Sequence, residues 1–295
     1  MFAKWIIIIT LLFGLILPIL AQDDLLDQLD KATNEETVYT TATFKATRII
    51  NGQSVERMKA KQLDIRIHHR FGTVNKGYKN FYGLDESNIL LSAEYGLTDK
   101  LMVGIGRTTI GKTVNGFLKY NVMEQCKGKI NRPVTVTLFT AMDVSTDEWL
   151  YTDRKDYFSN RLTYVFQALV ARKFGDHLSL QLSPTFIHRN LVPLATDMND
   201  VIALGIEGRY KISRRIALTA EFFPVLRPVY NYSSFAETNS LSVGVDLETG
   251  GHVFQIMFTN SVGMIEKDFI GETTQKWTDG AIRLGFNISR VFSLK

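Results

Sequence analysis

The sequence predicts an all-β protein: a single antiparallel, up-and-down transmembrane β-barrel of about twelve strands that follows a cleaved signal peptide. Three observations carry this prediction. Apolar and polar residues alternate along most of the chain, tight turns alternate with long connections, and the N-terminus begins with a long apolar run. The length of 295 residues, with 45% hydrophobic and 22% charged residues, suits one large barrel or two smaller folded domains and excludes a disordered chain.

The composition also excludes several classes of site. A single cysteine excludes an intramolecular disulfide framework and a four-cysteine zinc site. The net charge is +4, from 34 Lys and Arg against 30 Asp and Glu, and no dense basic block suggests a nucleic-acid surface. We therefore expect no cofactor, no metal site and no nucleic-acid partner.

The N-terminus predicts export. Lys4 precedes an unbroken apolar run that ends at Ala21, and polar residues follow at once. This is the layout of a cleaved signal peptide over 1–21, with an N-terminal membrane anchor as the alternative. Residues 22–37 then carry many acids and few apolar residues, which predicts a flexible acidic leader.

Strands are predicted from a period of two. In 201–212, Ile202, Leu204 and Ile206 share one face and oppose Glu207 and Arg209 on the other. The segments with this alternation are 63–71, 88–97, 101–109, 114–123, 133–142, 160–174, 178–189, 201–212, 216–225, 239–248, 252–260 and 281–292. Such runs are strands with one apolar face and one polar face.

The connections indicate an antiparallel meander. Short polar turns are expected at 98–100, 175–177, 213–215 and 249–251. Longer connections are expected at 143–159, 190–200, 226–238 and 261–280. Tight links that alternate with long ones are typical of a transmembrane barrel, which has short periplasmic turns and long outer loops.

A water-soluble barrel would alternate in the same way, but with its apolar face inward. Strand lengths of about nine to twelve residues favour the membrane version, and so does the chain's ending in a strand. Aromatic residues also gather near strand ends, as an interfacial girdle requires: Tyr95, Tyr120, Phe174, Tyr210 and Phe292. We expect the outer membrane of a Gram-negative bacterium, a polar, charge-paired lumen, and outer-membrane lipid and the barrel-assembly machinery as partners.

Several stretches resemble one known family. They include HRFG (69–72), EYGLTDKLMVGIGR (94–107), ETGGHVFQIMFTNS (248–261) and GFNISRVF (285–292). In these the chain is similar to an uncharacterised family of Gram-negative outer-membrane β-barrel proteins, a domain-of-unknown-function family. The resemblance implies a single barrel domain, for which we predict the bounds 61–295. It transfers no catalytic or binding residue.

The predicted polar face supplies the candidate site, which we expect to bind or pass a small polar or anionic solute without catalysis. The candidate lumen residues are Asp64, Arg66, His68, Arg70, Glu94, Lys119, Glu207, Arg209, Glu221, Asp246 and Arg283. Acids and bases are interleaved, so they either fill the interior as ion pairs or line a solute path. His68 and His69 are adjacent on a strand and cannot bind one metal ion together.

Two other functions stay open. The first is an outer-membrane lipid hydrolase with a Ser–His site on the barrel wall, in which His188 or His252 is the base. The candidate nucleophiles are Ser183, Ser240, Ser242 and Ser261. The second is a structural or surface-display barrel.

The segment 38–60 precedes the first clear strand. It alternates weakly and carries Lys45 and Arg48. We interpret it as an N-terminal extension or plug, and we prefer a plug in the lumen to a periplasmic extension.

Overall fold

A computed structural model describes residues 36–194, 197–226, 238–249 and 252–294. The expected signal peptide and residues 22–35 of the leader lie outside the described residues. The chain forms two compact units. In the smaller unit, β1 (Val38–Tyr39) pairs antiparallel with β6 (Cys126–Lys127). The larger unit begins at Thr41 and includes every other strand.

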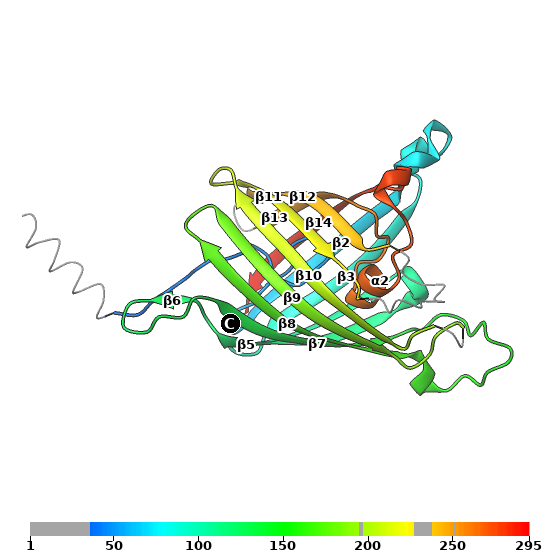
Figure 1. The fold of residues 1–295 in the computed structure, drawn as a ribbon, viewed down its shortest axis with the longest axis horizontal. Coiled ribbons are helices and arrows are strands. Elements are labelled where there is room, and N and C mark those ends of the chain that lie inside the picture. Colours follow the sequence, from blue (N-terminus) through cyan, green and yellow to red (C-terminus); the bar gives the residue numbers. More distant parts are fainter. Residues whose placement is uncertain (1–35, 195–196, 227–237, 250–251, 295) are drawn as a thin grey trace, which may run out of the picture. The chain divides into compact units, whose positions relative to one another are not determined.

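The larger unit is a closed barrel of twelve antiparallel strands (Figure 1), in which each strand pairs with its neighbours in sequence and β14 pairs with β2. The strands are β2 (Gln62–Thr73), β3 (Ser87–Gly96), β4 (Leu101–Thr108), β5 (Val114–Met123), β7 (Thr135–Val144), β8 (Leu162–Phe174), β9 (Leu178–Arg189), β10 (Asp200–Lys211), β11 (Ile216–Phe223), β12 (Ser240–Thr249), β13 (His252–Thr259) and β14 (Arg283–Ser293). This closed antiparallel barrel confirms the predicted fold class. Closure also leaves no edge of the sheet exposed.

The connections alternate in length as the sequence predicts. Links of a few residues join β3 to β4, β8 to β9 and β10 to β11. The connections at the other end are mostly longer, and they carry short helices: η1 (Val74–Lys76), η2 (Tyr78–Gly83), η3 (Ile110–Lys112), η4 (Phe158–Arg161), α2 (Glu266–Gly271) and η5 (Trp277–Asp279). Residues 227–237 and 250–251, which hold most of one expected loop and one expected turn, lie outside the described residues. Within the described ranges, no helix has the length and apolar character needed to cross a membrane.

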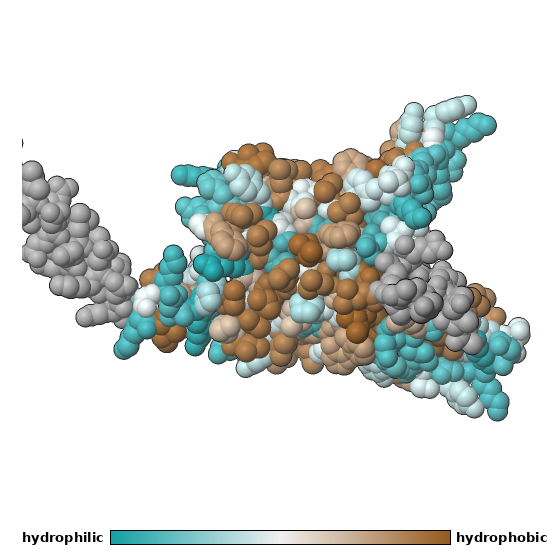
Figure 2. Space-filling view, in the orientation of Figure 1, coloured by the Kyte–Doolittle hydropathy of each residue, from teal (hydrophilic) through white to brown (hydrophobic). Residues whose placement is uncertain are grey.

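The apolar face of the strands points outward. On β10, Ile202 and Ile206 are 50% and 48% exposed, whereas Glu207 and Arg209 are buried on the inner side. Figure 2 shows the same pattern as apolar side chains spread over the barrel strands, with hydrophilic residues toward their ends. A soluble barrel would have its apolar face inward, so the outward apolar face identifies this barrel as a membrane barrel.

Placing a charged side chain on this outer face tests whether the face is in lipid or in water. We expect Ile206→Arg, in the middle of β10, to lower the free energy of unfolding in lipid vesicles by about 2–4 kcal/mol, because the guanidinium would lie in hydrocarbon. Urea titration measures the change, and Ile206→Val is the control. An effect within about 0.5 kcal/mol, the usual size for a surface position in water, would contradict a lipid-facing wall.

Candidate functional site

All eleven candidate lumen residues lie on the inner face of the barrel. Each is at most 7% exposed, although they come from seven different strands. The alternation of each strand explains the placement, because a residue two positions from an inward residue also points inward. Burial of this many charged groups requires partners for them.

A hairpin of the chain occupies the space that these residues surround. Residues 43–56 precede β2 and turn back on themselves: Arg48 bridges to Gln53, and the amide of Ile49 donates to the carbonyl of Gly52 at 2.9 Å. We call residues 43–56 the inner hairpin. From Thr43 to Val55 all but one of its residues are buried.

The tip of the inner hairpin is bound by a carboxylate. Glu221 on β11 accepts the amides of Asn51 and Gly52, each at 3.0 Å. The Asn51 side chain accepts from Arg70 on β2 at 2.7 Å and donates to Ser242 on β12 at 3.1 Å. Strands β2 and β11 are four strands apart in the wall, and together they bind the tip of the inner hairpin.

The tip also requires glycine. A Cβ on Gly52 would lie 2.9 Å from Glu207 Oε1 and 2.9 Å from the ring of Phe223. Both distances are shorter than normal contacts, so any side chain there would displace the wall or the hairpin.

The arms of the inner hairpin are bound through their backbone. Lys119 Nζ donates to the carbonyls of Thr47, Ser54 and Glu56 at 2.9, 3.1 and 3.1 Å. Wall amide side chains bind the rest: Gln255 donates to Ile49 O at 2.7 Å, Asn287 to Ile50 O at 2.9 Å and Gln181 to Gln53 O at 2.7 Å. These bonds satisfy backbone groups that no sheet partner reaches.

Most of the remaining candidate residues pair within the wall or with loops. Arg66 binds Asp64 at 2.8 Å. Arg209 lies between Asp246 at 3.4 Å and Glu248 at 2.6 Å. The other contacts are Glu94 with Thr47 of the inner hairpin, Glu207 with Gln181, and Arg283 with the Phe71 carbonyl and Gln275 at 3.0 Å each. The structure thus brings Arg70, Glu94, Lys119 and Glu221 into hydrogen bonds with the hairpin and packs Glu207 against Gly52 at its tip. The other charged candidates bind other partners, and His68 is buried beside them.

The inner wall is only partly polar, which differs from the expected polar lumen. On β7–β10 the inward residues include Phe139, Val165, Leu169, Ile187 and Val201. They form one cluster with apolar residues of the inner hairpin and of α2: Phe44, Ile49, Ile50, Val55, Phe269 and Ile270. Apolar residues are stable on this inner face because the enclosed segments cover them and exclude water.

Sequence reasoning missed two residues that bind the inner hairpin, Glu266 and Asn287. Glu266 of α2 forms a buried ion pair with Arg48 of the inner hairpin at 3.1 Å. Gln53 donates to the same carboxylate at 3.2 Å. Glu266 follows a long connection without periodicity, so no local signal placed it inside. Asn287 could have been found, because it follows the alternation of β14.

The serines and histidines proposed for a hydrolase do not pair. Ser183, Ser240, Ser242 and Ser261 are buried on the inner side. His188 is exposed and binds Asp200 at 2.6 Å.

A different pair is present on the outer wall. His69 Nε2 lies 2.7 Å from the hydroxyl of Ser87 on the adjacent strand. The imidazole stacks on Phe286, with ring centroids 5.0 Å apart and an interplanar angle of 2°. The two residues lie diagonally across β2 and β3, since Ser87 is directly opposite Phe71. The sequence placed His69 on the outer face, but only the strand register brings Ser87 to it.

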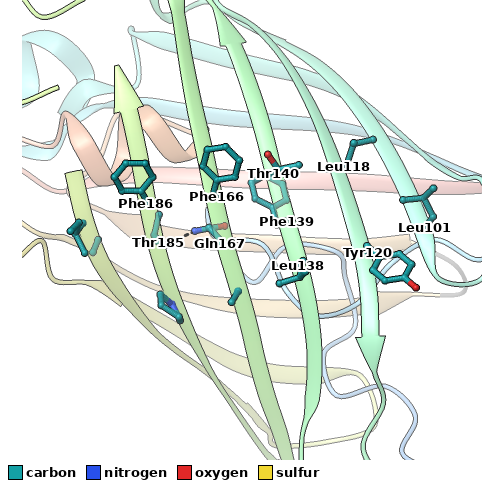
Figure 3. A pocket seen from close by; sticks show the side chains of 14 residues that line it. Leu101, Leu118, Tyr120, Leu138, Phe139, Thr140, Phe166, Gln167, Thr185 and Phe186 are labelled. Atoms are coloured by element: carbon teal, nitrogen blue, oxygen red, sulfur yellow. Dashed lines mark hydrogen bonds between the residues drawn. The ribbon is translucent and has the colours of Figure 1, made fainter. Parts of the chain in front are cut away.

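The outer wall also has an apolar hollow of about 730 Å³ over β4, β5 and β7–β10. Figure 3 shows its side chains, with Leu118, Leu138, Phe166 and Phe186 around it. Pro184 lines it, and the pairing of β8 with β9 is interrupted at this level because proline has no amide to donate. The lining residues include no Ser, His or carboxylate, and most of them are apolar.

Comparison with known proteins identifies the family. The family described as membrane-bound β-barrel domain (DUF5777) matches residues 44–292. The chain belongs to this family. The resemblance drawn from the sequence is thereby confirmed, as is the outer membrane of a Gram-negative bacterium as its location. The match begins within the inner hairpin and extends through β14.

The barrel is also similar to solved outer-membrane barrels. The NanC porin shares 13% identity over 79% of this chain and 99% of its own, with a TM-score of 0.48. The COG4313 outer-membrane channel from Pseudomonas putida F1 shares 16% over 81% and 98%, with a TM-score of 0.46. Outer-membrane phospholipase A from Escherichia coli shares 11% over 83% and 98%, with a TM-score of 0.40. A search of curated protein sequences finds no match.

The acceptor at the hairpin tip gives a stability prediction. We expect Glu221→Gln to lower the free energy of unfolding by about 1–3 kcal/mol, since an amide replaces the carboxylate that accepts two buried N–H groups. Urea unfolding in lipid measures it. The control is Glu86→Gln, which removes an exposed ion pair to Lys76 and should change stability by less than about 1 kcal/mol. Equal effects would show that the contact at the tip contributes no more than a surface pair.

Proposed function

We propose that this barrel passes small polar solutes across the outer membrane and that the inner hairpin is the plug that closes it. The observation that carries the proposal is the attachment of the hairpin. It is held by side chains of the wall through hydrogen bonds to its backbone and through an ion pair of Lys45 with Glu248 of β12 at 3.1 Å, and it takes no part in the ladder of the barrel.

The position of the plug in the chain supports its movement. The inner hairpin precedes β2, so it can leave the interior while all twelve strands stay paired. Its departure would free Lys119, Glu221 and the Arg70 amino group that binds Asn51, and would expose a path along the polar half of the wall. The apolar residues of β7–β10 would then form the opposite side.

The charges of the wall support a polar solute without strong preference for one sign. Five of the eleven candidates are Lys or Arg and five are Asp or Glu, with His68 between them. A path with both signs attracts neither cations nor anions strongly, whereas a ring of one sign selects for the opposite charge.

A disulfide that fixes the inner hairpin to the wall, and its reduction, test whether the hairpin closes the barrel. In a Cys126→Ser background, the pair Asn51→Cys and Ser242→Cys should form a disulfide, since the native side chains are 3.1 Å apart. We expect low single-channel conductance in planar bilayers while the disulfide is intact, and higher conductance after reduction in a variant that also carries Lys119→Met. Deletion of 43–56 should raise the conductance further.

The matched control is the Asn51→Cys variant alone, which cannot cross-link and should not respond to reductant. Low conductance in the deleted, reduced and oxidised proteins alike would exclude passage and leave a structural or surface-display barrel.

The pair of His69 and Ser87 supports a second candidate, a lipid hydrolase. The hydroxyl would attack an ester carbonyl of a membrane lipid while its proton passes to His69 Nε2. That proton would leave with the alcohol, and water would then release the fatty acid from the serine. The site is on the wall that faces lipid, and stacking on Phe286 orients the imidazole. Nδ1 of His69 has no hydrogen-bond partner among the described residues, so the third member of a catalytic triad is missing from this arrangement.

Fatty-acid release tests this candidate. In vesicles of phosphatidylethanolamine, Ser87→Ala and His69→Ala should each lower the rate of release by about a hundredfold or more, because the nucleophile or its base is lost. His188→Ala, which removes another exposed histidine of the wall, is the control. No release by the unchanged protein above that of vesicles alone would exclude hydrolysis.

A further inference from the structure

An open pocket of about 410 Å³ lies among the long connections of the barrel, within the usual ~300–1,000 Å³ of ligand pockets. The β7–β8 connection, the β9–β10 connection and α2 line it. Its two aromatic residues are Trp149 and Tyr151, whose ring centroids are 5.3 Å apart in an edge-to-face arrangement. We call this space the loop pocket.

The loop pocket is held in shape by its own side chains. Arg154 joins the two connections, donating to the carbonyls of Val192 at 2.7 Å and Pro193 at 3.1 Å. Trp149 Nε1 donates to the carbonyl of Arg154 at 2.8 Å. Arg161 forms a two-point pair with Asp156 at 2.7 and 2.6 Å, and these bonds lower the pKa of the Asp156 carboxyl. A ligand would therefore find a formed site and would have little loop ordering to offset.

The charges lining the loop pocket cancel. Its carboxylates are Asp147, Glu148 and Glu272, and its cations are Arg161, Arg189 and Lys267. A charged ligand would meet groups of its own sign wherever it lay. A hydroxyl group both donates and accepts, so a ligand rich in hydroxyls can use the carboxylates and the cations together. The aromatic rings add apolar surface for its C–H faces.

We propose that the loop pocket is the docking site for neutral saccharides. Binding of saccharides at the loop pocket does not depend on the proposed function. Their later passage through the barrel does rest on it. The position of the loop pocket next to the inner hairpin favours a link between saccharide binding and passage. Lys267 lines the pocket, and the preceding residue, Glu266, binds Arg48 of the inner hairpin at 3.1 Å.

Isothermal titration calorimetry of the full chain in detergent tests the site. The probes are the neutral sugars maltotriose, cellotriose and triacetylchitotriose, with glucuronate as the charged comparator. We expect at least one neutral trisaccharide to bind and glucuronate to bind more weakly. Trp149→Ala and Tyr151→Ala should each raise the Kd by about tenfold, because each removes an aromatic surface of the pocket.

Tyr157→Ala is the matched control, since this exposed aromatic residue belongs to the same connection and does not line the loop pocket. Circular dichroism establishes that each variant is folded. The proposal is overturned if no neutral trisaccharide binds, if glucuronate binds best, or if binding is unchanged in both pocket variants. Conductance of the protein lacking 43–56 separates the two hypotheses: conduction without saccharide binding overturns the docking site alone, and binding without conduction overturns passage alone.

Discussion

The structure depends on one requirement: within a bilayer, every backbone N–H and C=O must find a partner inside the protein. Closure of the barrel meets it for the strands, because β14 pairs with β2 and no edge remains. The inner hairpin faces the same requirement without a sheet to join. Its backbone groups are therefore bound by side chains of the wall, chiefly Lys119 for the carbonyls and Glu221 for the amides.

This requirement explains why the interior carries so many buried charges. Few of them are simple ion pairs between wall residues, as Asp64 and Arg66 are. Several instead serve peptide groups that would otherwise be unsatisfied, and a charged partner strengthens such bonds. The interior is thus built around a segment of backbone, and it is polar where that segment presents backbone and apolar where the segment presents Phe44, Ile50 and Val55.

The outer face and the loops follow different rules. The wall toward lipid is apolar, so a polar pair there, such as His69 with Ser87, stands out from its surroundings. The loops lie beyond the strands, where aromatic and charged residues can surround a pocket open to solvent. Three regions of one barrel therefore differ in what they present: polar groups matched to backbone inside, an apolar wall outside, and a pocket of aromatic and charged residues among the loops.

The sequence by itself determined the strands, their faces and the membrane, because side-chain direction along a strand is a local property with a period of two. It also placed all eleven candidate residues inside, from Asp64 to Arg283. Only the tertiary structure decided what they contact. The pairing of Glu221 with the hairpin tip, of Arg48 with Glu266 and of His69 with Ser87 depends on closure, register and loop path, and these join residues far apart in the chain for which periodicity carries no information.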